Sequence, residues 1–377
     1  MILNQNSPLS NIVLVFIGTV LVIFPALAQS IPADPGADVT YKVEKYLTAN
    51  FPVAMAFTAD GRLFYTEKAT GNVRLAFADG TDQIEPVIHL DTDALVERGL
   101  LGIALDPDYV ENGYIWTVHT RPGDSQNWPA NELVRFHEAD GLGTDPQVML
   151  SVPITTGELQ HNSGNIHFDK DGSLFMSIGD YGDATNAQKL DVPQGKIHHF
   201  AVTADGLKPA PGDPFPDSSI YVYGLRNTFD FTIDPISGAL FGSENGFHCD
   251  DEINLLLPGK NYGWSEKYGT QCFGTDPVDV PDYMPPLLSY TPTIAPTGIM
   301  VYDGDSFPAW QGQLFFCSFN TGQITRAVLD ETRTKVVSTA IVPLGKDQAC
   351  RTDIAVAPDG NIYFDDLSAI YRLVPEE

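Results

Sequence analysis

The chain contains 377 residues, of which 43% are hydrophobic, a composition that supports a large folded core and excludes a disordered chain. Its 49 acidic against 21 basic residues give a formal net charge of −28, which disfavours nucleic acids and anionic membranes because both would repel it. A cation or a neutral ligand suits this surface better, although a soluble, self-repelling surface is sufficient to explain the charge.

The first 28 residues predict a signal peptide. The apolar run IVLVFIGTVLVIFPALA ends in the small-x-small pattern Ala26-Leu27-Ala28, the kind of site that a signal peptidase cleaves. Cleavage would make the protein periplasmic or extracellular. An uncleaved membrane anchor is the alternative, because the run approaches the length that spans a bilayer. Residues 29–50 are expected to form a Pro-rich lead-in and a first strand.

One phrase recurs six times: an apolar strand, a turn built mostly on Asp-Gly or Asp-Pro, and a second alternating strand. Copies lie roughly 50 to 75 residues apart, a period that exceeds leucine-rich or ankyrin repeats and fits propeller blades. The copies read MAFTADGRLFYTEK, IALDPDYVENGYIWTVHT, IHFDKDGSLFMSIGD, FTIDPISGALFGSEN, FPAWQGQLFFCSF and IAVAPDGNIYFDDL.

We therefore predict an all-β fold, a six-bladed β-propeller over residues 51–377. Helical patterns are scarce, since 33 glycines and 28 prolines interrupt nearly every window. A pair of β-sandwiches is the rival fold, but it would not explain one phrase repeated six times. Propeller ligands usually bind at the mouth of the central channel, on the loops that lead into the innermost strands.

Four cysteines in an exported chain predict disulfide bonds. Three pairings are possible, and we favour Cys249–Cys272 with Cys317–Cys350 because each closes a modest loop. The CxxC spacing of a zinc site is absent from the sequence.

Two polar motifs precede innermost strands in adjacent repeats. QHNSG contains His161, and its short polar character predicts an exposed imidazole. LRN contains Arg226 and Asn227 at the equivalent point of the next repeat. A loop histidine and an arginine paired with Asp230 would be the structural explanation. A neutral base beside a fixed cation is also what removal of a proton from an alcohol requires.

An acidic phrase, SENGFHCDDEINLLLPGKNYGW, follows the fourth repeat. Its carboxylates and the loop carbonyls of Gly246 and Phe247 are hard oxygen ligands of the kind that Ca²⁺ prefers, and Asp251 is the favoured acidic ligand. The spacing is not that of an EF-hand, and a solvated acidic turn is the alternative.

The neighbours of three tryptophans in the sequence predict whether each is packed in the core or lies in a loop. Trp116 alternates within GYIWTVHT and is predicted to be core, whereas Trp128 and Trp264 lie in loop-like segments. Either loop tryptophan could line a sugar site, but packing is favoured for both.

The order of these phrases resembles the soluble glucose/sorbosone dehydrogenases, the aldose dehydrogenases that depend on pyrroloquinoline quinone (PQQ). GLLGIALDPDY, HNSGNIHFDKDGSLFMSIGD, YGLRNTFDFTIDP and DDEINLLLPGKNYGW carry the resemblance, which runs from about Phe51 to the C-terminus. It implies PQQ and Ca²⁺ at the channel mouth, bound near Glu97, Arg226, Asn227 and Arg351. It also implies that His161 takes the hydroxyl proton and that Arg226 stabilises negative charge, with Gln160 contacting the substrate.

Departures from the family pattern concern the cofactor. Glu97 replaces a common Gln beside a tricarboxylate, which should weaken PQQ binding. Cys350 and Thr352 stand where better-known members carry two arginines, and Asn320 stands near a lysine of some members. Arg351 lies between the altered positions and, because strand neighbours alternate faces, cannot simply replace either arginine.

The resemblance predicts a sugar dehydrogenase that oxidises a sugar hydroxyl to a lactone and passes electrons to an acceptor that the sequence does not identify. The main alternative is a non-redox propeller that binds carbohydrate or a partner protein after losing its PQQ contacts. A Ca²⁺-dependent hydrolase or lactonase is a third hypothesis, but it requires acids from several blades, and the acidic cluster lies in one loop.

Overall fold

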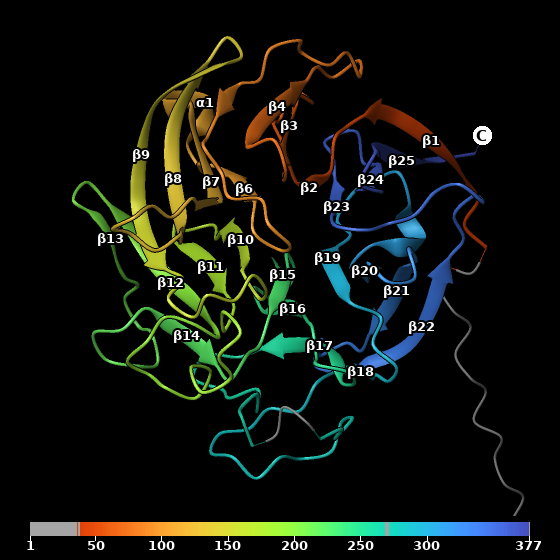
Figure 1. Ribbon diagram of the computed structural model, residues 1–377. Coiled ribbons are helices and arrows are strands. Elements are labelled where there is room, and N and C mark those ends of the chain that lie inside the picture. Colours follow the sequence, from red (N-terminus) through yellow and green to blue (C-terminus); the bar gives the residue numbers. More distant parts are fainter. Residues whose placement is uncertain (1–35, 37, 268–270, 377) are drawn as a thin grey trace, which may run out of the picture. The chain divides into compact units, whose positions relative to one another are not determined.

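The computed structural model describes residues 36, 38–267 and 271–376, and within them the strands form six antiparallel sheets around a central axis (Figure 1). This confirms the predicted all-β six-bladed propeller. The predicted signal peptide, residues 1–28, lies outside the described residues. Among the described residues, no helix has the length and apolar character needed to cross a membrane.

Each sheet is one blade, numbered here in chain order, and its strands run outward from the axis. Blade 1 contains β2 (Pro52–Phe57), β3 (Leu63–Glu67), β4 (Asn72–Ala76) and β5 (Ile88–His89). Blade 2 contains β6 (Leu100–Leu105), β7 (Tyr114–Arg121), β8 (Ala130–Ala139) and β9 (Leu142–Pro153), with the short helix α1 (Tyr109–Asn112) after β6. Blade 3 contains β10 (Ser163–Phe168), β11 (Leu174–Ile178), β12 (Lys196–Thr203) and β13 (Gly206–Pro209), and β14 (Ile220–Tyr223) also pairs with β12.

The last three blades repeat the arrangement. Blade 4 contains β15 (Thr228–Ile233), β16 (Leu240–Glu244), β17 (Asp251–Leu256) and β18 (Leu288–Tyr290). Blade 5 contains β19 (Pro296–Val301), β20 (Leu314–Ser318), β21 (Ile324–Leu329) and β22 (Val336–Val342), with the 3₁₀ turn η1 (Pro308–Trp310) before β20. Blade 6 contains β23 (Ile354–Val356), β24 (Ile362–Asp365) and β25 (Ala369–Pro375), and its outer strand is β1 (Tyr41–Thr48).

The repeated turn explains the first hairpin of several blades. In blade 3, Asp171 Oδ1 accepts hydrogen bonds from the Ser173 backbone N–H at 2.9 Å and from its hydroxyl, while Gly172 adopts a positive φ of 83°. Gly172 suits this position because a side chain would be strained in the left-handed region. Asp359 caps the Asn361 N–H in the same way in blade 6.

Irregularities in the innermost strands help to hold the blades together. Five of these strands carry a β-bulge or register shift, which leaves backbone N–H groups without ladder partners. Buried carboxylates of the preceding blade accept two of them: Asp230 Oδ2 accepts from Ile299 N–H at 2.9 Å, and Asp353 Oδ2 accepts from Met55 N–H at 2.7 Å. These aspartates therefore connect neighbouring blades around the axis.

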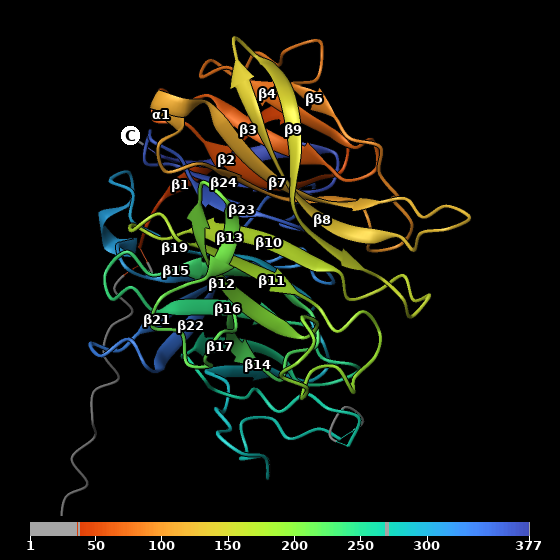
Figure 2. The same cartoon turned by 90° about the vertical axis from the view of Figure 1, so that its left-hand side faces the viewer.

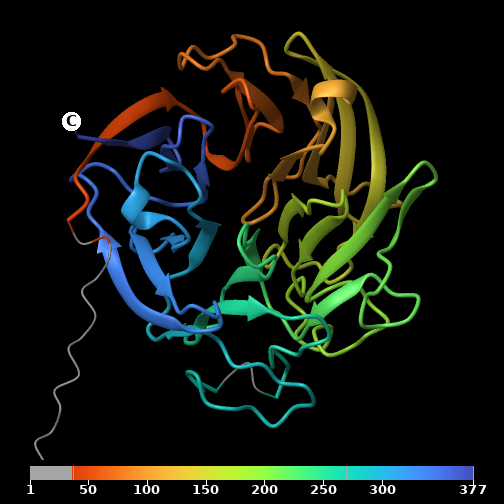
Figure 3. The ribbon, with the colours of Figure 1, turned by 180° about the vertical axis from the view of Figure 1, so that it is seen from behind.

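The chain closes the ring with strands from both of its ends. β1 pairs antiparallel with β25, from Tyr41 opposite Pro375 to Thr48 opposite Ala369, and the two strands lie side by side in Figures 1 and 3. Apolar clusters fill the spaces between blades. One of them joins Trp116 of blade 2 to Ile166 and Met176 of blade 3. Trp116 is fully buried, as predicted.

Candidate active site at the channel mouth

One face of the propeller carries the predicted site residues. In an antiparallel blade, the loop into the innermost strand and the loop between the second and third strands emerge at the same end. Here the loops into β6, β10, β15, β19 and β23 meet the loops after β3, β16 and β20, and residues from both sets line one cavity. Seen from the side in Figure 2, the segment between β17 and β18 extends beyond blade 4.

His161 ends the loop before β10 and adopts a left-handed backbone with a φ of 57°. Its Nδ1 lies 2.6 Å from Asp180 Oδ1, and its Nε2 is buried without a hydrogen-bond partner. The predicted exposure of this imidazole is wrong, because only 8% of the residue is accessible. The Asp180 contact explains the burial, since it draws the ring against the end of β11.

Asp180 organises the surroundings of His161. Its Oδ1 also accepts the Gly182 N–H at 2.8 Å, and its Oδ2 accepts the indole Nε1–H of Trp264 at 2.7 Å. Asp180 is 1% exposed, so these donors satisfy a buried carboxylate. When Nδ1–H donates to Asp180, the opposite nitrogen, Nε2, presents its lone pair.

Arg226 stands next to this group. Its guanidinium lies 5.4 Å from the Trp264 ring centre and 6.0 Å from that of Phe247, and its Nη1 donates to Asn245 O at 2.8 Å. Its Nε is buried without a partner, and burial lowers the pKa of Arg226 despite the nearby carboxylates of Asp180 and Glu244. The alternative pairing with Asp230 is not formed.

The carboxylate of Asp230 has other hydrogen-bond partners. Asp230 accepts hydrogen bonds from Asn165 and His167 on β10. Arg226 is therefore a cation held by aromatic rings and one carbonyl, beside the histidine and aspartate pair.

Glu97 and Asn227 connect the loops of three blades. Glu97 Oε2 accepts the His161 backbone N–H at 2.6 Å and lies 3.5 Å from Asn227 Nδ2. Asn227 Oδ1 accepts from the Ser163 backbone N–H and hydroxyl at 3.2 and 3.0 Å. Glu97 thus supports the backbone of the His161 loop. Gln160, one residue earlier, is exposed on the same loop.

A cavity of about 310 Å³ opens beside these loops. Its lining combines aromatic and aliphatic side chains with amides and hydroxyls, and its charged lining residues are Lys68 and Glu97. The lining residues are Phe51, Val53, Lys68, Val96, Glu97, Leu101, Ser163, Asn227, Phe229, Asn245, Ala295, Thr297, Phe319, Asn320 and Thr352.

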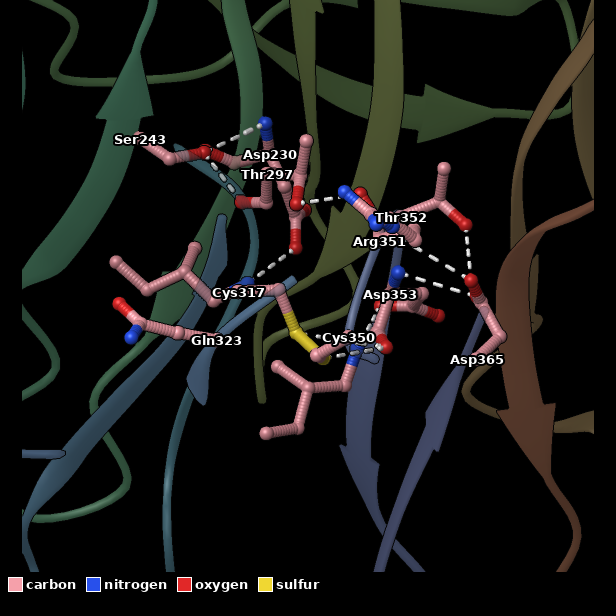
Figure 4. The surroundings of a disulfide bond; sticks show 12 residues. Asp230, Ser243, Thr297, Cys317, Gln323, Cys350, Arg351, Thr352, Asp353 and Asp365 are labelled. Atoms are coloured by element: carbon pink, nitrogen blue, oxygen red, sulfur yellow. Dashed lines mark hydrogen bonds between the residues drawn. A yellow bond between two sulfur atoms is a disulfide. The ribbon is translucent and has the colours of Figure 1, made fainter. Parts of the chain in front are cut away.

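Arg351 does not line this cavity. Its Nη1 donates to Phe319 O, its guanidinium lies 5.9 Å from the Phe319 ring centre, and its neighbour Thr352 faces the cavity instead. Figure 4 shows Thr352 hydrogen-bonded to Asp365. This arrangement agrees with the expectation that Arg351 cannot simply replace an arginine at position 350 or 352.

The predicted disulfide pairing is confirmed. Cys317 on β20 is bonded to Cys350, in the segment that leads into β23, with their Cα atoms 5.2 Å apart (Figure 4). Cys249 is bonded to Cys272, with a Cα separation of 5.7 Å. The first bond joins blades 5 and 6 beside the mouth, and the second ties the β17–β18 segment to the loop after β16.

The acidic phrase forms the loop after β16 and the start of β17. Asp251, 1% exposed, accepts the Gly246 N–H at 2.8 Å and the Ile294 and Ala295 N–H groups at 2.6 Å. Burial, with the repulsion of neighbouring acids, raises the pKa of Glu252 to about 8, and burial raises that of Glu244 to about 7. The loop therefore holds more buried carboxylates than cations.

The carboxylates of this loop do not converge as a preformed metal site. Among the described residues, the group found at ligand spacing is His248, Cys249 and Cys272, whose cysteines form a disulfide. Phe247, whose carbonyl was predicted as a ligand, has an exposed side chain beside Arg226.

Sequence reasoning missed Asp180 and Lys68 and misjudged Trp128. Trp128 is 56% exposed, so its predicted packing is wrong, and Trp264 is half-buried against Asp180 and Arg226. The position of Lys68 in its repeat could have indicated its place at the mouth. Like Asn245 and Phe319, it directly follows the second strand of a blade, and all three residues line the cavity.

A protein-family model described as glucose/sorbosone dehydrogenase matches residues 49–369. The chain belongs to this family. An aldose sugar dehydrogenase of Escherichia coli is 31% identical over 291 residues, covering 71% of this chain and 74% of the relative. A quinoprotein glucose dehydrogenase of Acinetobacter calcoaceticus is 26% identical over 399 residues, covering 84% and 82%.

Solved structures of proteins named glucose dehydrogenase or aldose sugar dehydrogenase match the propeller. The PQQ-bound aldose sugar dehydrogenase of Streptomyces coelicolor superposes with a TM-score of 0.74 and 25% identity, over 90% of this chain and 99% of that one. This member of the family therefore has the fold of a PQQ-type aldose sugar dehydrogenase.

Proposed function

We propose that the protein is an exported sugar dehydrogenase that oxidises a sugar hydroxyl to a lactone at the channel mouth. The observation that carries the proposal is the state of His161: Asp180 fixes Nδ1, and the buried Nε2 has no partner. A base oriented in this way can take the hydroxyl proton of a bound sugar. The contact with Asp180 stabilises the imidazolium that results.

The residues of the cavity fit PQQ as the cofactor. The cavity of about 310 Å³ offers aromatic walls for a flat ring, and amide and hydroxyl groups that can bond its oxygen atoms. Asn227 and Thr352 would hold the group, and Arg226 lines a neighbouring pocket with Phe247 and Trp264. When bound, PQQ supplies the acceptor for the hydride that leaves the sugar carbon.

The other polar residues of the mouth would then act on the substrate. Arg226 is a fixed cation whose Nε lacks a partner, so it can stabilise negative charge that develops on the sugar oxygen. Gln160, exposed on the loop of His161, can bind a sugar hydroxyl. Trp264 shields the Asp180 carboxylate from water.

The loop after β16 fits Ca²⁺. The proposed donors are oxygen atoms, the ligand type that Ca²⁺ takes, and Asp251 is a buried carboxylate whose negative charge a cation would offset. Asp251 and the carbonyls of Gly246 and Phe247 are the proposed ligands. Their backbone is continuous with Asn245, which accepts from Arg226, so an ion there would stiffen the mouth.

A non-redox carbohydrate-binding or partner-binding propeller is the second candidate. The observation that favours it is the lining of the cavity, which contains one basic residue, Lys68, one acidic residue, Glu97, and Thr352 in place of an arginine. A neutral sugar needs no excess of basic residues, whereas a tricarboxylate gains from one.

Calorimetric titration of the mature chain with PQQ, with and without Ca²⁺, separates the two candidates. The dehydrogenase proposal expects saturable binding that is tighter with Ca²⁺. Absence of heat and of any Ca²⁺ effect at high PQQ, together with binding of a sugar in the same protein sample, would overturn it in favour of the second candidate.

A further inference from the structure

Lys68 is a buried cation at the channel mouth that takes no part in the proposed reaction. It is 8% exposed and directly follows β3. Among the described residues that line the mouth cavity, it is the only basic one. A buried lysine at a ligand cavity calls for an anionic partner, because an ammonium group loses hydration there.

The backbone and the aliphatic stem of Lys68 are fixed. Its N–H donates to Phe51 O at 3.0 Å, and its carbonyl accepts the Leu100 N–H at 3.1 Å, so it connects the segments that lead into blades 1 and 2. A Cβ added to Gly99 would lie 2.5 Å from the Lys68 Cγ. Gly99 is thus required for the close approach of the Lys68 stem and carbonyl.

The ammonium group has a sparse set of partners. Nζ donates to Ala94 O at 3.2 Å and lies 5.2 Å from the centre of the Phe51 ring, which is itself part of the cavity wall. An ammonium group has three N–H donors, and Ala94 O uses one of them. Burial lowers the pKa of Lys68, while the charges of Glu97 and Asp93 oppose that effect.

Glu97 does not neutralise this lysine through a close ion pair. Its Oε2 accepts the His161 backbone N–H at 2.6 Å, and the nearby Asn227 amide adds a second donor. The carboxylate is therefore committed to the loop of His161. This leaves the Lys68 ammonium able to bind a second anion inside the cavity.

We propose that Lys68 is the anion-binding residue of the mouth cavity and that it binds one carboxylate of the cofactor. The assignment rests on the proposed function for the identity of that cofactor. The aromatic rings of Phe51 and Phe319 then border the ring system, and neutral groups such as Asn245 and Thr297 meet the other oxygen atoms. The single charged contact from Lys68 would then replace the arginine and lysine contacts that other family members make from blades 5 and 6.

The test compares PQQ with its uncharged trimethyl ester. Both are titrated into wild-type protein and into Lys68→Gln, Lys68→Arg and Lys189→Gln, where Lys189 is an exposed lysine bonded to Thr185. We expect Lys68→Gln to weaken PQQ binding about tenfold or more, since it removes a charge-assisted hydrogen bond. Lys68→Arg and Lys189→Gln should stay within about threefold of wild type, and the ester should respond little to any variant.

Two results would overturn the proposal: Lys68→Gln binds PQQ as tightly as wild type, or it loses PQQ and ester equally while its melting temperature is unchanged. If wild type binds no PQQ, the cofactor of the proposed function is wrong, and Lys68 is tested separately with 1,4-naphthoquinone-2-carboxylate and 1,4-naphthoquinone. A preference for the carboxylate that disappears in Lys68→Gln supports the anion site. Equal binding of both probes refutes it.

Discussion

At the scale of single residues, the mouth is organised around the backbone of His161. A Cβ on Gly179 would lie 2.0 Å from the His161 carbonyl oxygen, so only glycine permits this approach. Glu97 holds the N–H of the same residue, and Asp180 holds its ring. Two separate segments, one at Glu97 and one at Gly179 and Asp180, therefore fix the backbone and the ring of this residue, which a loop-filling histidine does not need.

Replacing His161 tests its proposed role as the base. We expect His161→Gln to lower kcat for sugar oxidation by roughly 10²–10⁴, because proton removal loses its acceptor, with a small change in KM. Asp180→Asn should lower kcat less. His89→Gln, in an exposed histidine bonded to Asn72, is the matched control. Steady-state kinetics with an artificial acceptor measures all three, and wild-type kcat in His161→Gln would contradict the assignment.

Glu97 offers a test of the electrostatics of the cavity. Glu97→Gln keeps an oxygen that can accept the His161 N–H and removes a negative charge from the cavity wall. PQQ binding should tighten by about 3- to 10-fold, as expected for loss of about 1 kcal/mol of repulsion. Isothermal titration at two salt concentrations measures the effect, and weaker binding by the variant would show that the carboxylate aids the cofactor.

At the scale of elements, the disulfide between Cys317 and Cys350 takes the place of other cross-blade contacts. Cys317 lies opposite the bulge of β19, the position where the hydroxyls of Thr66 and Ser243 donate to carbonyls of the next blade, Leu101 O and Thr297 O. In blade 5 the sulfur atom instead tethers the segment before β23, which fixes Thr352 toward the cavity.

Removing this disulfide should destabilise the propeller. The bond spans 33 residues, so the chain-entropy estimate for Cys317→Ala with Cys350→Ala is a loss of about 3–4 kcal/mol in unfolding free energy. Urea unfolding measures this free energy for the double variant and for wild type with and without reductant. Unchanged stability of the double variant would show that the blade contacts suffice without the bond.

The elements also show what the sequence could and could not predict. The repeated turn predicted the blades and the places of His161 and Arg226, because strand alternation and turn chemistry are local. Asp180 was missed because its partners, His161 and Trp264, come from other loops. The burial of His161 and the outward turn of Arg351 likewise depend on contacts between blades, which no local pattern encodes.

At the scale of the whole molecule, buried polar groups stabilise the ring within a limited pH range. His198 is 4% exposed, its Nε2 lies 2.8 Å from Pro193 O, and its Nδ1 lies 2.9 Å from the Ser219 hydroxyl. This network satisfies a neutral imidazole that donates to the carbonyl and accepts from the hydroxyl. Burial accordingly lowers the pKa of His198 to about 4.

The pH dependence of stability follows from that shift. The unfolded chain binds a proton at His198 near pH 6.5, whereas the folded chain binds it only near pH 4, so stability should fall as pH decreases through this window. The loss attributable to His198 reaches about 3 kcal/mol at the acid end. Urea unfolding of wild type and His198→Gln from pH 7 to 4 measures this loss, and the variant should lose less unfolding free energy than wild type. If the unfolding free energy of both proteins fell equally with pH, His198 would not be the cause of the loss.

The central claim, that this member of the glucose/sorbosone dehydrogenase family oxidises sugars, has a direct test. Purified mature protein, incubated with PQQ and Ca²⁺, is supplied with a panel of aldoses and an artificial electron acceptor, beside His161→Gln prepared identically. We predict acceptor reduction that requires aldose and PQQ and is lost in His161→Gln. Sugar binding without acceptor reduction, under conditions where PQQ is bound, would contradict it.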